Sequence, residues 1–292
     1  MNNLTSQGHD VHCLDAITYA ADPDRLDKAH IITCDITHEI NEKLVGTDYN
    51  YILHLAAETH VDNSITDPLR FVYTNVLGTA NMLEFARKQK NLKCFLYFST
   101  DEVFGPAPEG TLYKEWDRYN SGNPYAATKA GGEELTLAYG NTYKLPVIIT
   151  HTMNVFGPTQ HIEKFIPSTI KKILSEEQVI IHANKERTKA GSRFYIHSEN
   201  VAKAVDFVLE NGELQEKYNI VGEKEVDNLN LAKMIANILD KPLKYELVDF
   251  HSSRPGHDLR YGLDGSRLKE MGWELPDSFE DSLRKTVEWY RV

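Results

Sequence analysis

Five short apolar runs in the first half of the chain each lead into a small or hydrogen-bonding residue, and this repeat is what most restricts the fold. The runs cover residues 11–14, 31–34, 51–55, 94–98 and 146–150. Apolar runs without strict polar alternation are typical of strands buried on both faces of a parallel sheet. Long helical patterns over residues 67–88 and 125–139 separate the last three runs. Strand and helix in alternation predict right-handed crossovers and a doubly wound, Rossmann-like α/β fold.

The second half of the chain is less regular, and it predicts a smaller α/β domain packed on the first. Its helical patterns lie near residues 165–174, 200–209, 229–239 and 279–290. At about 150 residues per domain, a chain of 292 residues has room for two. We therefore expect a first domain over residues 1–157 and a second mainly over residues 158–292, with the segment near 195–210 returning to the first.

Charge and composition exclude several classes of function. Lys and Arg number 32 against 43 Asp and Glu, a net charge of -11, so no broad basic face is available for nucleic acid. No stretch reaches the roughly 18 consecutive apolar residues of a membrane helix, and the N-terminus lacks the basic and then apolar order of a signal peptide. Cys13, Cys34 and Cys94 and the 12 scattered histidines show no metal-site spacing, so we expect reduced thiols, no bound metal and a soluble, cytoplasmic protein.

The residues at the ends of the apolar runs predict a ligand cleft, because ligands of open α/β sheets bind outside the carboxyl ends of the strands. Successive runs lead into Asp15, into Asp35, into Ala56 with Ala57, into the triplet Thr100, Asp101 and Glu102, and into Asn154. A single polar strand end marks only the start of a loop, whereas the whole set favours a cleft. Asp15 matches the acidic residue that binds ribose hydroxyls in dinucleotide sites, and its carboxylate favours NAD over NADP because it would repel a 2′-phosphate.

Tyr125 and Lys129 lie four residues apart at the start of the second helical pattern, on one face of a helix and one turn apart. A phenol with its ordinary pKa of about 10 is a poor base at neutral pH. A lysine cation nearby, helped by a nicotinamide cation, stabilises the phenolate and lets it accept a proton from an alcohol. Such a spacing alone is more often a surface pair, but its position one loop after Thr100 favours a catalytic pair.

The adjacent carboxyls of Asp101 and Glu102 suit an elimination. In a closed cleft, different environments push the pKa values of two carboxyls apart, so that one serves as acid and the other as base. Removal of water beside a ketone needs such a pair, a base for the acidified carbon and an acid for the departing hydroxyl. The alternative is a solvated acidic turn in a chain with 43 acidic residues, and the apolar run before the pair argues against it.

Several motifs together resemble one known family. They are Ser99-Thr100-Asp101-Glu102-Val103-Phe104-Gly105, Tyr125-x-x-x-Lys129, His54-Leu55-Ala56-Ala57-Glu58-Thr59-His60, Asn154-Val155-Phe156-Gly157-Pro158 and Arg254-Pro255-Gly256-His257-Asp258. Over nearly its whole length the chain resembles the nucleotide-sugar 4,6-dehydratases of the extended short-chain dehydrogenase/reductase superfamily, those acting on dTDP-glucose above all. Related epimerases and decarboxylases share the Tyr-x-x-x-Lys pattern but usually lack the adjacent Asp and Glu.

The resemblance implies an NAD-dependent lyase that converts a nucleoside-diphosphate glucose into the 4-keto-6-deoxy sugar. NAD would bind to residues 1–157, and the nucleotide sugar mainly to residues 158–292. Tyr125 would take the proton of the C4 hydroxyl, with Thr100 orienting the sugar, while hydride passes to NAD. Glu102 would then remove the C5 proton and Asp101 would protonate the departing C6 hydroxyl, after which hydride returns to C6.

The resemblance also implies binding residues and an assembly. Expected contacts to NAD come from Asp15, Asp35, Ile36, Ala56, Ala57, Asn75, Tyr125 and Lys129. Expected contacts to the nucleotide sugar come from His60, Asn154, Arg193, Asn228, Arg254 and His257. Arginine suits this role because its planar fork matches phosphate oxygens in pairs. A homodimer is expected through the helices over residues 71–88 and 125–139.

Two features depart from the family pattern. No Gly-x-x-Gly-x-x-Gly turn is present, and residues 1–10 align with the end of the helix after it, so on the order of twenty residues, with the central first strand, are missing. Without that strand we expect the sheet to open between its neighbours and the main phosphate contacts to be lost. His151 stands where the family usually has Arg. Two alternatives therefore remain, a 4-epimerase that uses only Tyr125 and Lys129, and a cofactor-impaired protein that binds nucleotide sugars without turnover.

Overall fold

A computed structural model describes residues 1–21, 30–46, 48–250 and 259–291, and the chain forms two compact units. The first unit joins Met1–Val103, Asn123–His151 and Asp206–Tyr218, and the second joins Phe104–Gly122, Thr152–Val205 and Asn219–Val292. This division differs from the expected boundary at residue 157 and from the expected return near residues 195–210. The stretch that returns to the first unit is Asp206–Tyr218, later in the chain than expected, because it ends in the first residues of a strand that belongs to the sheet of the first unit. Residues 104–122 join the second unit because backbone hydrogen bonds tie them to Arg260 and Gly262.

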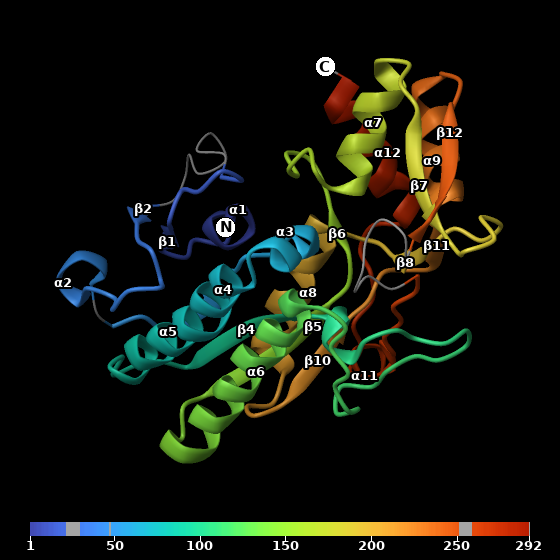
Figure 1. Cartoon of the computed structure of the whole chain (residues 1–292). Coiled ribbons are helices and arrows are strands. Elements are labelled where there is room, and N and C mark those ends of the chain that lie inside the picture. The colour runs from blue at the N-terminus through green and yellow to red at the C-terminus, as the bar shows by residue number, and fades with distance from the viewer. Residues whose placement is uncertain (22–29, 47, 251–258, 292) are drawn as a thin grey trace. The chain divides into compact units, whose positions relative to one another are not determined.

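The first unit alternates strands and helices, as its apolar runs predicted. In chain order it holds α1 (Asn2–Ser6), β1 (His12–Asp15), β2 (His30–Thr33), α2 (Glu42–Val45), β3 (Tyr51–His54), α3 (Val61–Thr66), α4 (Pro68–Phe71), a π-helical turn (Val72–Leu77), α5 (Gly78–Arg87), β4 (Cys94–Thr100), α6 (Pro124–Tyr143), β5 (Val147–Thr152) and the start of β10 (Lys217–Ile220) (Figure 1). β1 pairs in parallel with β2, and β3 with β4. The predicted α/β fold with parallel strands is confirmed.

The sheet of the first unit is split. Its strands run in the order β10-β5-β4-β3, while β1 and β2 form a separate pair. Tyr51 lies opposite Cys94 in one piece, and Asp15 lies opposite Thr33 in the other. In the doubly wound order, a central strand lies between the positions held here by β1 and β3. No strand of the described residues fills that place, so the sheet opens there, as the sequence predicted.

Helix α6 runs along β4 and beside α5 (Figure 1). Asn123 caps its N-terminus, since the side-chain Oδ1 accepts a hydrogen bond from the Ala126 N–H at 2.9 Å. Pro124 occupies the first turn, where its missing N–H has no partner to lose. The helix ends at Tyr143, and the capping residue Lys144 adopts the left-handed conformation with φ of 59°. Almost all of β4 is buried, so α6 rests on a rigid, apolar strand.

The helix beside α6 changes type along its length. α4 passes into the π-helical turn Val72–Leu77 and then into α5, so the single helix predicted over residues 67–88 is interrupted. A π-helical turn takes one more residue than an α-helical turn. With this extra residue, Phe71 packs edge-on against Tyr125, with ring centres 6.4 Å apart. Gly78 meanwhile lies against Ile36, where an added Cβ would come within 2.7 Å of the Ile36 side chain.

The second unit contains short strands and three packed helices. Its elements are β6 (Val155–Phe156), α7 (Phe165–Leu174), β7 (Val179–Ala183), β8 (Ser192–Phe194), β9 (Ile196–His197), the start of α8 (Ser198–Asn211), β11 (Glu225–Asp227), α9 (Asn228–Leu239), β12 (Tyr245–Asp249), α11 (Ser266–Glu270) and α12 (Phe279–Arg291). The core lies between α7, α9 and α12 and the parallel pair β7–β12, around Ile181, Leu231 and Leu283. Its predicted helices are confirmed, whereas its strands were not predicted. None of the described helices has the length and apolar character that crossing a membrane requires.

Candidate active site

The triplet Thr100, Asp101 and Glu102 lies where β4 passes into a short 3₁₀ turn. β4 ends at Thr100, and Asp101–Phe104 form the turn. The Thr100 hydroxyl donates a hydrogen bond to Asp101 Oδ1 at 3.0 Å and accepts one from the Glu102 N–H at 3.3 Å. Thr100 and Asp101 are buried, and Glu102 is half-buried. The structure therefore gathers all three side chains at the carboxyl end of a buried strand.

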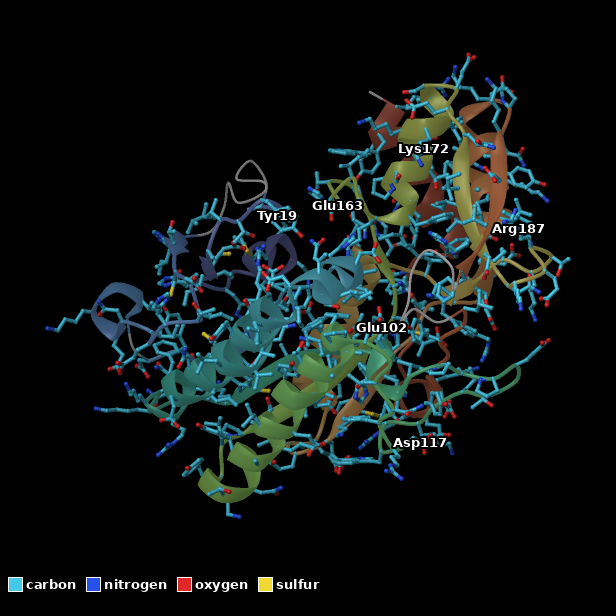
Figure 2. The ribbon with its side chains drawn as sticks, viewed as in Figure 1. Tyr19, Glu102, Asp117, Glu163, Lys172 and Arg187 are labelled. Atoms are coloured by element: carbon cyan, nitrogen blue, oxygen red, sulfur yellow. The ribbon has the colours of Figure 1, made fainter. Side chains whose placement is uncertain are left out.

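The start of helix α6 brings Tyr125 to this triplet. Asn123, at the helix cap, donates from Nδ2 to Glu102 Oε2 at 3.1 Å, which ties the Glu102 carboxylate (labelled in Figure 2) to the beginning of α6. The hydroxyls of Tyr125 and Thr100 share a hydrogen bond. Tyr125 is buried against Phe71. A hydroxyl, two carboxyls and a phenol thus share one place in the first unit.

Lys129 lies one turn further along α6, and its side chain is buried. Its Nζ donates to the Phe98 carbonyl oxygen at 2.5 Å. Burial lowers the pKa of Lys129 to about 7, so both its ammonium and its amine forms occur near neutral pH. Burial, with the Lys129 charge as second cause, lowers the pKa of His54 on β3 to about 3. His54 is therefore neutral beside Lys129 at physiological pH.

The pKa of Tyr125 moves away from the range that a general base needs. Burial raises it, and the negative charge of Glu102 raises it further, while the hydrogen bond with Thr100 lowers it. From the sequence, we expect a nearby cation to favour the phenolate. In the protein without a bound cofactor, the burial of Tyr125 and the charge of Glu102 outweigh this effect and raise the pKa of the phenol. Turning Tyr125 into a base therefore takes additional positive charge at the site.

Asn75, an expected cofactor contact, braces the segment after β3 against α6. Its Oδ1 accepts the Glu58 N–H at 2.8 Å, and its Nδ2 donates to the Glu58 carbonyl and to the Thr128 hydroxyl, both at 3.0 Å. Asn75 is buried within the π-helical turn. The segment that it fixes contains Ala56 and Ala57, so Asn75 sets the position of two other expected contacts.

The other expected cofactor contacts lie at the carboxyl ends of strands in the first unit. They are Asp15 at the end of β1, Asp35 and the buried Ile36 after β2, and Ala56 and Ala57 after β3. Asp15 Oδ1 accepts the Ile17 N–H at 2.7 Å, and Asp35 Oδ1 accepts the Thr37 N–H at 2.9 Å. The bond from Thr37 lowers the pKa of Asp35, so this carboxylate stays ionised.

Tyr19, four residues after Asp15, lines an open hollow of about 350 Å³. The other lining residues are Asn63, Thr66, Asp67, Arg70 and Phe71. The Asn63 amide donates to the Tyr19 hydroxyl at 3.2 Å, and the Arg70 guanidinium lies 5.7 Å from the Tyr19 ring centre and pairs with Glu58 at 2.5 Å. The volume falls in the range of small-molecule sites. Sequence reasoning missed this hollow, because neither Tyr19 (Figure 2) nor Arg70 belongs to a motif with a known role.

Two further side chains of the first unit bear on the site. His60, an expected substrate contact, stands half-buried at the cap of α3, the helix that supplies Asn63. Ser99, which the sequence analysis did not select, is buried on β4, and its hydroxyl has no hydrogen-bond partner among the described residues. A buried hydroxyl in that state costs free energy until a water or a ligand bonds to it. Ser99 is thus a candidate ligand contact, which its place in the motif alone does not single out.

The expected nucleotide-sugar contacts of the second unit fall into two places. Asn154 follows β5, and its buried Oδ1 has no hydrogen-bond partner in the part of the chain that the structure describes. Arg193 on β8 and Asn228 at the start of α9 are brought together by the pairing of β8 with β11. The Tyr195 hydroxyl donates to Asn228 Oδ1 at 2.7 Å, and the Arg193 guanidinium lies 4.6 Å from the ring centre of Tyr261. Arg254 and His257 lie outside the described residues.

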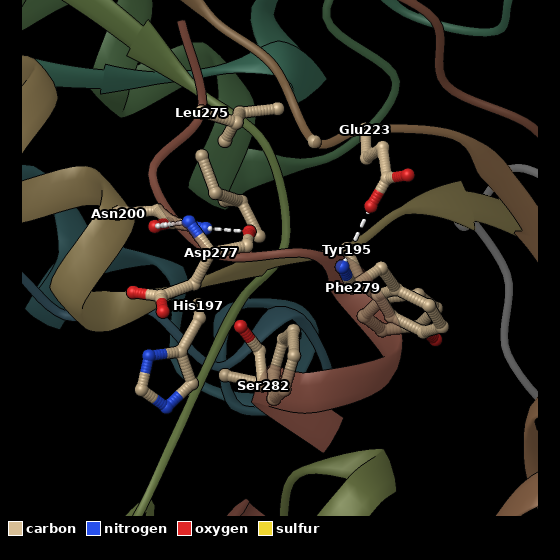
Figure 3. Close-up of a pocket in the computed structure, with 11 residues that line it drawn as sticks. Tyr195, His197, Asn200, Glu223, Leu275, Asp277, Phe279 and Ser282 are labelled. Carbon is tan, nitrogen blue, oxygen red and sulfur yellow. Dashed lines mark hydrogen bonds between the residues drawn. The ribbon is translucent and has the colours of Figure 1, made fainter. Parts of the chain in front are cut away.

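A small cavity in the second unit is too small for a nucleotide sugar. Figure 3 shows its lining, which includes His197, Asn200, Asp277 and Ser282. Its volume of about 10 Å³ has room for one water molecule. No group of three or more His, Cys, Asp or Glu side chains placed to hold a metal ion occurs among the described residues.

Several known proteins similar to this chain are named as enzymes that act on sugar nucleotides. The dTDP-glucose 4,6-dehydratase of Salmonella typhimurium is 35% identical over an alignment of 313 positions, which covers 99% of this chain and 84% of that protein. A trifunctional UDP-glucose 4,6-dehydratase/3,5-epimerase/reductase of Arabidopsis thaliana is 35% identical over 287 residues, 95% of this chain, but the chain spans only 42% of its length. The structure of a double mutant of the dTDP-glucose 4,6-dehydratase DesIV from Streptomyces venezuelae, solved with NAD, superimposes with a TM-score of 0.88 at 31% identity, covering 99% of this chain and 92% of that one.

The family assignment rests on the extent of these matches together with the geometry of the site. The family match covers residues 1–221, which include Thr100, Asp101, Glu102, Tyr125 and Lys129. The doubly wound fold and the gathering of these five side chains agree with it. The chain therefore belongs to the NAD dependent epimerase/dehydratase family.

Proposed function

We propose that this protein is an NAD-dependent hydro-lyase that removes water across C5 and C6 of a nucleoside-diphosphate glucose to give the 4-keto-6-deoxy sugar. The substrate that we propose is dTDP-glucose. The observation that carries the proposal is the placement of Asp101 and Glu102 beside Thr100 and Tyr125 at the end of β4. An epimerase needs the hydroxyl, the phenol and the lysine, but it has no use for two carboxyls held at the same place. The similarity to dehydratases acting on dTDP-glucose supports the choice of substrate.

The donor set of the first unit fits NAD. Asp15 and Asp35 offer carboxylates that can accept hydrogen bonds from ribose hydroxyls, and the buried Ser99 hydroxyl has no hydrogen-bond partner among the described residues. The Arg70 guanidinium, beside Tyr19, offers a partner for phosphate oxygens. When bound, NAD would accept a hydride from C4 of the sugar and return it to C6, and its nicotinamide cation would supply the positive charge that the phenol needs.

The side chains of this chain perform the proton transfers. Tyr125, as phenolate, takes the proton of the C4 hydroxyl, and Thr100 holds that oxygen in place. Glu102 takes the C5 proton, which the neighbouring C4 ketone makes acidic, and Asp101 gives a proton to the C6 oxygen, which leaves as water. The ammonium of Lys129 stabilises the phenolate through the field it adds at Tyr125. In the second unit, Asn154, Arg193 and Asn228, and the undescribed Arg254 and His257, would bind the nucleotide diphosphate. In the first unit, His60 would bind the sugar.

The test is mass spectrometry of dTDP-glucose and UDP-glucose incubated with the purified chain and NAD. We expect the dTDP sugar to lose one water. The conservative variant Asp101→Asn with Glu102→Gln should abolish this loss, and Tyr125→Phe should do the same at the earlier proton transfer. An unchanged mass with a new sugar configuration, still formed by the Asp101→Asn, Glu102→Gln variant, would identify a 4-epimerase. Binding of dTDP-glucose without any turnover would identify a protein that only binds nucleotide sugars.

The same proposal includes a cytoplasmic homodimer built on the helices around residues 71–88 and 125–139. Leu69, Val72, Tyr73 and Leu77 are exposed at helical spacing, with Leu69 63% and Tyr73 55% accessible. An apolar stripe of this kind on a helix is suited to packing against a second copy. The three cysteines are free thiols, which agrees with a reducing compartment. Light scattering should give twice the chain mass, and Tyr73→Lys should shift it to the monomer; a monomeric wild-type chain would contradict the dimer.

A further inference from the structure

The ammonium of Lys129 lies over the face of an aromatic ring. Its Nζ is 4.4 Å from the ring centre of Tyr97, the fully buried fourth residue of β4. The face of a phenol ring is electronegative and attracts a cation within about 6 Å, most strongly where water is excluded. Together with the Phe98 carbonyl at 2.5 Å, the ring provides the near surroundings of this buried charge.

Tyr97 also contacts the backbone of the same lysine. Its hydroxyl donates to the Lys129 carbonyl oxygen at 3.0 Å. Gly132 leaves the room for this hydroxyl, since a Cβ there would lie 2.4 Å from the Tyr97 oxygen. Burial raises the pKa of Tyr97 well above its ordinary value, so the phenol stays neutral and its hydroxyl keeps its proton for this bond. One side chain therefore touches Lys129 at both ends.

We propose that Tyr97 is a positioning residue, whose ring holds the Lys129 ammonium charged and in place, one helical turn from Tyr125, and whose hydroxyl fixes the backbone of α6 at Lys129. The consequence for catalysis rests on the proposed function, in which the Lys129 charge stabilises the Tyr125 phenolate. The contact itself, a ring that favours the protonated lysine, rests only on the geometry of β4 and α6.

Other charged and titratable groups around Lys129 do not replace the ring. His54 on β3 is neutral near pH 7, so it adds no compensating charge. Asp101 and Glu102 act on Tyr125, whose pKa they raise. Glu133, one turn further along α6, is engaged by Lys217 at 2.8 Å and by His151 at 3.2 Å.

The experiment measures the pKa of Lys129 directly, by trace acetylation of the whole protein across a pH series and mass spectrometry of the peptide that contains Lys129. Tyr97→Leu removes the ring, Tyr97→Met is a second ring-free variant in case the first folds poorly, and Tyr97→Phe keeps the ring but removes the hydroxyl. Phe95→Leu is the matched control, because it deletes a buried ring from the same face of the same strand. Removal of the ring should lower the pKa of Lys129 by about one unit, a tenfold change in its protonation equilibrium.

Tyr97→Phe and Phe95→Leu should leave the pKa of Lys129 near its wild-type value. Equal values in wild type, Tyr97→Leu and Tyr97→Met would overturn the proposal, and so would a shift in Phe95→Leu as large as theirs. The labelling needs neither substrate nor NAD, so it succeeds or fails independently of the dehydratase assignment. Where the protein turns over dTDP-glucose, the alkaline limb of the rate profile should move down by the same amount in the ring-free variants and should be restored in Tyr97→Phe.

Discussion

Replacing Lys217 by methionine removes one partner from a buried charge cluster that fastens helix α6 to β5 and β10. The cluster consists of Glu133 on α6, His151 on β5 and Lys217 on β10, with side chains 0%, 0% and 4% exposed. Lys217 Nζ lies 2.8 Å from Glu133 Oε1, and His151 Nε2 lies 3.2 Å from each carboxylate oxygen. Although burial raises the pKa of Glu133, the charges and hydrogen bonds of His151 and Lys217 together hold it below its ordinary value. Glu133 is therefore a buried carboxylate that depends on both partners.

The expected cost follows from this geometry. Breaking a buried ion pair by removing one partner costs about 3–5 kcal/mol, because the other charge stays buried and uncompensated. Since His151 remains in contact with Glu133, we expect the lower end, about 3 kcal/mol of unfolding free energy. For a chain of this size, that corresponds to a fall in Tm of roughly 5 °C. The double variant Glu133→Gln, Lys217→Met buries no unpaired charge and should recover at least half of the loss.

Urea and thermal unfolding at pH 7 test this prediction. The matched control is Lys88→Met, which removes an ion pair with Glu42 in which Lys88 is 45% exposed, and it should change stability far less, because solvent screens an exposed pair. The reasoning is refuted if Lys217→Met costs no more than this control, or if the double variant is less stable than Lys217→Met alone. Either result would mean that the carboxylate of Glu133 is not held by Lys217 in solution.

Four further outcomes are expected. Lys129→Met should abolish turnover yet raise the unfolding free energy that urea titrations measure at pH 7. The reason is that burial lowers the pKa of Lys129 from 10.5 to about 7, so burying this side chain destabilises the wild-type fold. The destabilisation is complete below pH 7 and declines as pH rises from 7 toward 10.5. Glu133→Gln should reduce the loss of stability that the protein shows on acidification below about pH 4.5. Folding lowers the pKa of Glu133, so its carboxylate stabilises the fold above its ordinary pKa of 4.5, and this stability is lost as pH falls through the pKa of the folded protein. Tm measured from about pH 3 to 6 tests this. Gly132→Ala should cost about 1–3 kcal/mol in urea unfolding, since its Cβ would lie 2.8 Å from the Asn75 carbonyl oxygen. Cys94 should resist thiol reagents at pH 8 in the native protein, with reaction followed by mass spectrometry, because burial raises its pKa to about 12.

The sequence predicted the first unit well because its strands are buried and its helices are long. Residues 94–98 and 125–139 differ from β4 and α6 only at their ends. The strands of the second unit were missed because they are short and only partly buried. β12, for example, begins with two exposed residues, and β8 has only three residues. Neither gives a run that stands out from its surroundings.

The candidate site was predictable where a motif carries chemistry and not where a side chain acts through a distant partner. Thr100, Tyr125 and the two carboxyls follow from spacing and from their place after a strand. The hydrogen bonds of Asn75 to Glu58 and Thr128 depend on a π-helical turn, which the hydrophobic periodicity of the sequence does not predict. The stacking of Tyr97 under Lys129 depends on the register of α6 over β4. The roles in ligand binding assigned to Asp15, Asp35, Arg193 and Asn228 stay predictions.

The π-helical turn Val72–Leu77 makes the number of residues in this stretch matter more than their identity. Each residue of an α-helix turns the chain by about 100°, so deletion of one residue here would close the wide turn and rotate Phe71 away from Tyr125, or Gly78 away from Ile36. Substitutions at the exposed positions Val72 and Tyr73 leave this packing in place, because neither side chain is buried in it. Insertions and deletions in this helix should therefore disturb the packing of the first unit, whereas a point change at Val72 or Tyr73 should act only on the proposed dimer contact.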